Sequence, residues 1–330
     1  MISNIVYFGA DRVKKNTIDR FFYHVTNQMA DLNLFEDDQS FKKFWDGISI
    51  DFRSDFEDAI GEVEGDALLS LIDQTFIAFE NFRNDKRVRS LGVRSPEFIS
   101  RKKSAKFFSY LFEKLNEYKG SDFSLSIPKV SSVDIVNNIL EIKNEKLSSS
   151  NFNLKLEILL ESPHVIFQGS IFEDLRKFSK DSLEIHFGPY DYLSNFDLPP
   201  TELSVTHPVS MKGLMEVQLR SIIHGFKFNY GAINHIPDMK NKDSVNDLFN
   251  IFETLHRHGM YDGWILHPSQ FVIKVASLYE LISKNTSNAS NALANFLEGD
   301  SKATLEDDQF HDQATINTLT RFLSRFKFEN

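Results

Sequence analysis

The feature that most constrains the fold of this chain is a unit that recurs about eight times along it. In each unit a short apolar run with strand character ends at an acid or a turn residue, and an amphipathic stretch of helical length follows. Strands that alternate with helices form parallel sheets, and this many units suit a closed barrel better than an open sheet. The strand-like runs lie at 4–12, 47–60, 86–96, 123–130, 154–165, 183–193, 226–238 and 262–271.

These units predict an α/β fold, a single TIM (β/α)8 barrel over residues 1–284. The remainder, 285–330, is polar at first and then amphipathic in "TINTLTRFLSRF". We expect it to form a linker and a C-terminal helix that packs on the barrel or on a neighbouring subunit.

The net charge, the lack of cysteine and the lack of long apolar runs exclude several classes of function. The net charge is −10 and no long basic run occurs, which argues against nucleic acid and anionic membrane as partners. The absence of cysteine excludes disulfides, thiolate catalysis and cysteine-ligated zinc. The chain starts without the pattern of a secretory signal and has no run of 18 apolar residues, so we expect a cytoplasmic protein.

Polar residues stand at the predicted C-terminal ends of several strands, where barrels of this type carry their chemistry. Taken singly, each has an ordinary structural explanation, such as the preference for acids at a helix N-terminus. Two separate carboxylates, an arginine and a lysine at one end of a barrel together favour Mg²⁺, which takes one or two carboxylates and keeps waters or substrate oxygens. The candidates are Asp55, Glu57, Asp58, Arg87, Arg89, Lys129, Glu161, Asp191 and His267.

Six motifs at these strand ends resemble, in order, the signatures of the citrate lyase β-subunit and HpcH/HpaI aldolase superfamily. They are "DFEDAI", "VRSLGVRSP", "IPKV", "LLESP", "FGPYDYL" and "DGWILHPSQ", and the resemblance extends over about residues 4–282. The chain is especially similar to an uncharacterised aldolase-like branch. The resemblance implies a metal-dependent carbon–carbon lyase built on a barrel, and a homo-oligomer, since relatives are usually oligomeric.

Carried over to this sequence, the resemblance implies that Glu161 and Asp191 are the two ligands of Mg²⁺ or Mn²⁺. Gly188 and Pro189 are expected to contact the substrate and to turn the chain sharply, so that the carboxylate of Asp191 points over the barrel mouth.

The same resemblance implies roles for the remaining charged residues. Arg89 would hold the substrate carboxylate and the developing enolate oxygen, with Arg87 as the equivalent in the alternative register. Glu57 and Asp58 would orient that arginine or take part in proton transfer, and Lys129 matches the family lysine on the fourth strand.

The chemistry fits these roles. Cleavage of a carbon–carbon bond next to a carbonyl leaves an enolate, which a Lewis-acidic ion and a forked guanidinium both stabilise. The expected partner is therefore a small carboxylic-acid substrate, a hydroxy-oxo acid or a hydroxyacyl thioester.

Three departures from the family pattern leave the substrate pocket and any coenzyme A site open. Leu91 replaces the usual asparagine, Tyr230 stands where relatives commonly have an aspartate, and "SPHVIFQG" replaces a glycine-rich turn. An alternative is thus a barrel that has lost catalysis and acts as a binding or regulatory subunit. Phosphoryl transfer is a weaker alternative, because no Gly-rich loop is present to cradle a phosphate.

Overall fold

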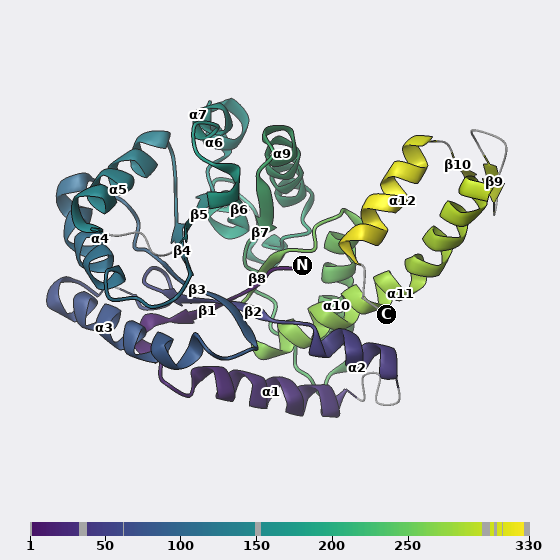
Figure 1. Ribbon diagram of the computed structural model, residues 1–330, viewed down its shortest axis with the longest axis horizontal. Coiled ribbons are helices and arrows are strands. Elements are labelled where there is room, and N and C mark those ends of the chain that lie inside the picture. Colours follow the sequence, from purple (N-terminus) through teal and green to yellow (C-terminus); the bar gives the residue numbers. More distant parts are fainter. Residues whose placement is uncertain are drawn as a thin grey trace.

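Eight parallel strands close into a barrel in chain order, which confirms the predicted TIM barrel (Figure 1). The computed structural model describes residues 2–32, 38–61, 63–148, 153–298, 304–306, 309–311 and 313–326. The barrel strands are β1 (Asn4–Gly9), β2 (Ile50–Asp55), β3 (Val88–Arg94), β4 (Asp122–Ile127), β5 (Asn153–Leu160), β6 (Leu183–Phe187), β7 (Lys227–Tyr230) and β8 (Gly263–Ile265).

Helices surround the barrel and connect its strands. The α-helices are α1 (Thr17–Asp31), α2 (Gln39–Asp46), α3 (Gly65–Phe82), α4 (Arg101–Leu115), α5 (Val133–Lys146), α6 (Pro163–Gln168), α7 (Ile171–Leu175), α8 (Pro189–Leu193), α9 (Pro208–His224), α10 (Lys242–Arg257), α11 (Pro268–Glu298) and α12 (Gln313–Arg325). Short 3-10 helices are η1 (Ala10–Arg12), η2 (Lys180–Ser182) and η3 (Pro200–Glu202). None of the described helices is long and apolar enough to cross a membrane.

The C-terminal region differs from the expected linker. Helix α11 runs unbroken to Glu298, so the predicted boundary at 284 falls inside a helix. An antiparallel pair, β9 (Thr304–Glu306) and β10 (Gln309–His311), follows, and α12 supplies the expected terminal helix. Figure 1 shows that the end of α11, the hairpin and α12 form an arm beside the barrel. The arm is anchored where Arg325 bonds to Asp262, with Nη2 and Oδ2 2.6 Å apart.

Side chains on the outer face of the barrel form the main hydrophobic core with the helices. Leu91 and Tyr230 both belong to this core and are buried. The ring of Tyr230 lies 5.4 Å from Nζ of Lys274 on α11. Both departures from the family pattern therefore affect packing between barrel and helices, and neither residue reaches the barrel mouth.

The inside of the barrel is polar and charged towards the N-terminal ends of the strands, unlike the branched aliphatic layers usual in this fold. Arg53 on β2 donates through Nη2 to Oε1 of Glu157 on β5 at 2.5 Å. Glu184 on β6 pairs with Nζ of Lys155 and of Lys227, each at 3.1 Å. These pairs neutralise the acids that the interior buries.

Candidate active site

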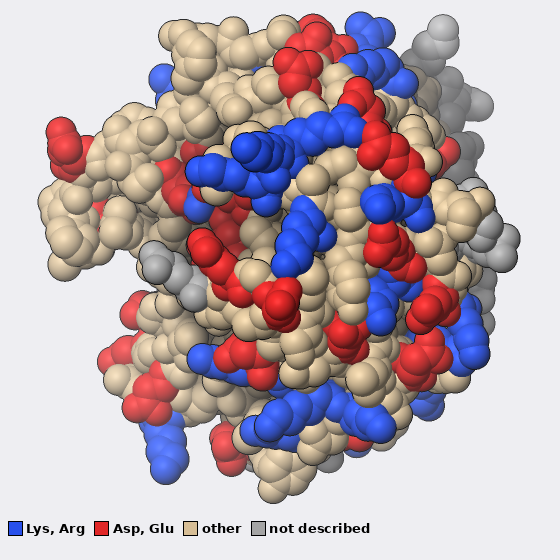
Figure 2. Space-filling view, turned by 90° about the vertical axis from the view of Figure 1, so that its left-hand side faces the viewer, with Lys and Arg blue, Asp and Glu red and all other residues tan. Residues whose placement is uncertain are grey.

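Charged side chains converge at the C-terminal ends of the strands. The structure brings together Glu57, Asp58, Lys129, Glu161 and Asp191, as the sequence predicted. Figure 2 shows one face of the molecule, on which basic and acidic side chains intermingle without an extended basic patch. This face therefore offers no uniform surface charge that would attract a ligand, and we expect binding to depend on local contacts at the barrel mouth.

Arg94, at the end of β3, is the arginine of this site. Its Nε and Nη2 clasp the carboxylate of Asp55 at 2.7 and 2.5 Å. Its Nη1 lies 2.8 Å from Oε2 of Glu57 and 3.2 Å from Oδ2 of Asp58. The guanidinium also lies 5.6 Å from the ring centroid of Trp264, so charge and ring together hold it in one orientation.

Arg87 and Arg89 lie elsewhere, so their predicted placement at the mouth is wrong. The pairing of β2 with β3 shifts register between Ile50 and Asp51, which makes Arg89 the extra residue of a bulge near the start of the strand. There Arg89 donates to Asp51 at the opposite end of the barrel. Arg87 precedes β3 and pairs outside the barrel with Asp85 and Asp19, both at 2.6 Å.

A signal for Arg94 was present in the sequence. Of the three arginines in "KRVRSLGVRSP", it alone stands next to the Ser-Pro that ends the run. Active-site groups come from the C-terminal end of a barrel strand, so the last arginine is the better candidate by that rule. The bulge at Arg89 could not be read from the sequence.

Lys129 follows β4 in a left-handed conformation, with φ +53°, the one described non-glycine residue with positive φ. Such a backbone costs free energy in a residue with a side chain and is often found at functional sites. It lets Lys129 N–H donate to Oε2 of Glu161 at 2.8 Å while Nζ pairs with Oε1 of Glu57 at 2.9 Å. Nζ also lies 3.9 Å from Oδ1 of Asp191, so this lysine connects three acids.

Gly188 allows Glu161 and Asp191 to come from neighbouring strand ends. A Cβ at this position would collide with Oε1, Cγ and Cδ of Glu161, so any other residue would displace the Glu161 side chain from its present position. Pro189 then begins the short helix α8, and Asp191 stands half-exposed in its first turn. The two carboxylates therefore face the same space at the mouth.

Excess negative charge perturbs the acids of this site. Burial, together with the charges of Asp191 and Glu57, raises the pKa of Glu161 to about 8. Burial also raises the pKa of Glu57 to about 7, although Arg94 opposes the shift. Two adjoining carboxylates that lack enough compensating positive charge fit a hard divalent cation, for which Glu161 and Asp191 are the candidate ligands.

A second acidic cluster lies inside the barrel. Ligand atoms of Glu157, Glu184 and His186 come within 4.8 Å of one another, so the cluster has metal-like spacing. Its acids are already paired with Arg53, Lys155 and Lys227. A divalent ion would have to displace these cations, so we assign the cluster a structural role.

The mouth encloses a cavity of about 300 Å³. Its lining includes Arg94, Glu161 and Asp191, together with aromatic residues that sequence reasoning did not single out, Tyr7 and Trp264. The two tyrosines beside Asp191 lie in different environments: Tyr190 lines the cavity, and Tyr192 is buried in the core.

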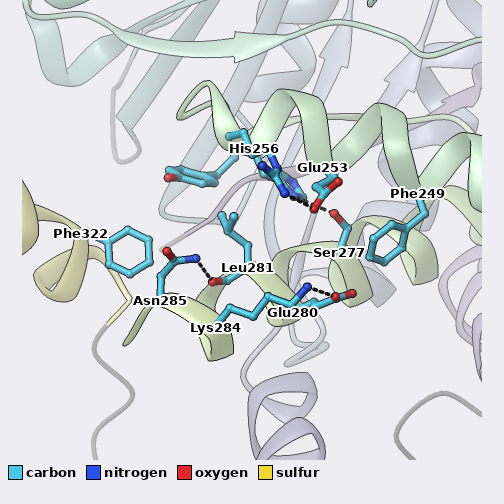
Figure 3. A pocket seen from close by; sticks show the side chains of 11 residues that line it. Phe249, Glu253, His256, Ser277, Glu280, Leu281, Lys284, Asn285 and Phe322 are labelled. Carbon is cyan, nitrogen blue, oxygen red and sulfur yellow. Dashed lines mark hydrogen bonds and ion pairs between the residues drawn. The ribbon is translucent and has the colours of Figure 1, made fainter. Parts of the chain in front are cut away.

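A larger cavity, of about 490 Å³, lies between α10, α11 and α12, away from the barrel mouth (Figure 3). Its charged residues are paired along their own helices, Glu253 with Arg257 and Glu280 with Lys284. Burial lowers the pKa of His256 to about 3, so this lining histidine is neutral near pH 7. Size alone therefore does not identify the reactive site.

His267 has a structural role. Its Nδ1 lies 2.7 Å from Oγ of Ser269 and accepts from Ser269 N–H at 3.3 Å, at the start of α11. The side chain thus caps the N-terminus of this helix.

The chain belongs to the family described as "Domain of unknown function (DUF6986)", which matches residues 43–327. No curated protein matches the chain by sequence.

Solved structures of similar fold include a citrate lyase from Burkholderia xenovorans LB400, with 15% identity, a TM-score of 0.69, and 98% of this chain and 91% of that chain covered. CitE from Mycobacterium tuberculosis, in complex with magnesium, acetoacetate and coenzyme A, has 13% identity, a TM-score of 0.61 and coverage of 98% and 97%. Haloferax volcanii malate synthase, in a magnesium and glyoxylate complex, has 16% identity, a TM-score of 0.53 and coverage of 83% and 80%. These likenesses confirm the predicted resemblance in fold.

Proposed function

We propose that this member of the family is a Mg²⁺-dependent carbon–carbon lyase or aldolase that cleaves or forms a small hydroxy-oxo acid. The observation that carries the proposal is the convergence of Glu161 and Asp191 beside Arg94 at the barrel mouth. The raised pKa of Glu161 supports it, because a carboxyl in that state gains most from a nearby cation. CitE and the malate synthase, which share the fold, were solved with magnesium.

Glu161 and Asp191 would hold the ion, which when bound supplies a Lewis acid for the oxygens of a 2-oxo acid. Arg94 stays charged at any working pH, since its carboxylate neighbours raise its pKa against the effect of burial. Its Nη1 side, shared between Glu57 and the exposed Asp58, is the part that can turn to an enolate oxygen.

Glu57 is the proposed proton acceptor. Its pKa of about 7 lets it take a proton from a substrate hydroxyl and return it near neutral pH. Lys129 and Arg94, at 2.9 and 2.8 Å from its two oxygens, hold the carboxylate in position. Asp58 is more exposed and orients Arg94.

A hydroxyacyl thioester is a further candidate substrate. The cavity of about 300 Å³ accommodates the acyl part of a thioester, so coenzyme A itself would lie outside it.

The test is an assay for release of pyruvate, oxaloacetate or glyoxylate from a panel of hydroxy-oxo acids. We expect turnover that chelation removes and Mg²⁺ restores. Asp191→Ala should lower kcat/KM by about 10² to 10³, while the exposed control Asp197→Ala retains the wild-type value. Turnover that neither chelation nor Asp191→Ala affects would contradict the proposal.

A binding or regulatory subunit is the second candidate. The observation in its favour is that Arg94 is fully engaged by Asp55, Glu57 and Asp58. If so, the protein binds Mg²⁺ and an oxo acid without turnover of any member of the panel. Detected release of an oxo acid would rule this candidate out.

A further inference from the structure

The cavity at the barrel mouth has two chemically different sides. Charged groups come from the ends of β2, β3 and β5 and from α8: Asp55, Asp58, Arg94, Glu161 and Asp191. The side formed by β1, β8 and the segment after β7 carries no charged lining residue and consists of Tyr7, Ala232, Asn234, Trp264 and Leu266.

The polar atoms of the two rings on the neutral side point away from the cavity. Trp264 donates through Nε1 to Nδ1 of His186 at 2.9 Å, in the barrel interior. The hydroxyl of Tyr7 lies 3.2 Å from Oγ of Ser126, also buried. The two rings pack together with centroids 4.3 Å apart, so the wall they offer to a ligand is apolar.

The cations of the site are already engaged. Arg94 is bound by Asp55, Glu57 and Asp58, and Lys129 by Glu57 with Asp191 nearby. One substrate carboxylate can bind together with a divalent ion at Glu161 and Asp191. The cation nearest to the neutral side is Arg94, whose guanidinium lies 5.4 and 5.6 Å from the ring centroids of Tyr7 and Trp264. Because three acids already bind it, a second carboxylate on that side would meet no unpaired cation among the described lining residues.

We infer that the site takes a 2-oxo monocarboxylic acid whose remainder is apolar, and that it discriminates against dicarboxylic acids. The inference rests on the proposed function, since it places the 2-oxo acid head at the ion. The ring pair of Tyr7 and Trp264, with Leu266 at the rim, would cover the apolar remainder.

Trp264 supplies a readout that does not depend on turnover. The chain has two tryptophans, and Trp45 lies on α2, so Trp45→Phe leaves one reporter in the cavity. Emission is followed while 5-methyl-2-oxohexanoate or 2-oxoglutarate is added in the presence of Mg²⁺. These two acids have the same number of heavy atoms and differ in an isopropyl group against a carboxylate.

The apolar acid is expected to bind at least about tenfold more tightly than 2-oxoglutarate, because the second carboxylate would be desolvated without a partner. Equal or tighter binding of 2-oxoglutarate would overturn the inference while leaving the metal site intact. If Mg²⁺ binds but neither acid binds to the Mg²⁺-loaded protein, the inference is overturned too. Failure of Mg²⁺ itself to bind, measured without any acid, would instead contradict the proposed function and remove the basis of the inference.

A designed reversal gives the sharper test. Leu266 is 41% exposed at the rim, so a polar residue there should not disturb folding. Leu266→Lys adds the missing cation and should shift the preference toward 2-oxoglutarate by about tenfold or more, whereas Leu266→Gln, its neutral control, should not. An unchanged preference in Leu266→Lys would show that the rim does not face the substrate remainder.

Discussion

The two ends of this barrel use the same kinds of residue with opposite electrostatic results. Near the N-terminal ends of the strands, Asp51, Glu157 and Glu184 are matched by Arg89, Arg53, Lys155 and Lys227. At the mouth, Asp55, Glu57, Asp58, Glu161 and Asp191 are matched only by Arg94 and Lys129 among the described residues. One end is compensated, and the other has spare negative charge.

The pKa values follow this difference. Burial acts to raise the pKa of Glu157, but Arg53 lowers it below the usual value, and the partners of Glu184 lower its pKa strongly. At the mouth burial prevails, and the pKa values of Glu161 and Glu57 rise to about 8 and about 7. Clustered carboxylates occur at both ends, and the lack of compensating charge is what distinguishes the candidate metal site at the mouth.

The same substitution at the two ends should have opposite effects on stability. Glu157→Gln leaves Arg53 buried without its counter-charge, which should lower the free energy of unfolding by about 3–5 kcal/mol. Urea unfolding at pH 7 measures this loss. A loss below about 1 kcal/mol, within the range of exposed pairs, would mean that the interior is not held by its ion pairs.

Glu161→Gln should instead stabilise the metal-free protein. The pKa of Glu161 in the folded state, about 8, lies above its ordinary value of 4.5, so the metal-free protein loses stability as pH rises between these values. At pH 9 the variant should melt about 2–4 °C higher than the wild type, and at pH 4 the two should coincide. A lower melting temperature of the variant at pH 9 would mean that nearby positive charge compensates the ionised Glu161, as it does for Glu157.

Arg87→Ala tests the finding that Arg87 lies away from the barrel mouth. This substitution should have the smallest effect of the three. Arg87 pairs with Asp85 and Asp19 outside the barrel, so we expect a loss of at most about 1 kcal/mol in unfolding free energy and unchanged Mg²⁺ binding. Weakened Mg²⁺ binding in this variant would restore Arg87 to the site.

The barrel and the position of its mouth could be predicted from the sequence, because alternating strands and helices form a closed parallel sheet whose C-terminal strand ends lie together. This rule places Glu161, Asp191 and Lys129 at the mouth, while the roles proposed for them come from the family resemblance. Arg94 was missed because the bulge at Arg89 breaks the alternation of the strand, which no local pattern reveals.

The charged barrel interior was also not predicted. Lys155 and Glu157 read as part of an apolar strand, and their partners Glu184 and Arg53 come from other strands. Tyr230 was expected to alter the pocket, but the alternation of β7 turns it outward against Lys274. Strand register and the partners of buried charges depend on which distant segments pair, and a single sequence does not show these pairings.

Calorimetric titration of Mg²⁺ into the metal-free protein, in two buffers of different ionisation enthalpy, tests the proposed metal site at Glu161 and Asp191. Because Glu161 is mostly protonated at pH 7, binding should release close to one proton. The affinity should be about tenfold weaker at pH 6 than at pH 7, and binding should be lost in Asp191→Ala. Binding that persists unchanged in Asp191→Ala, or that releases no proton, would contradict the claim that the uncompensated mouth of this barrel is its metal site.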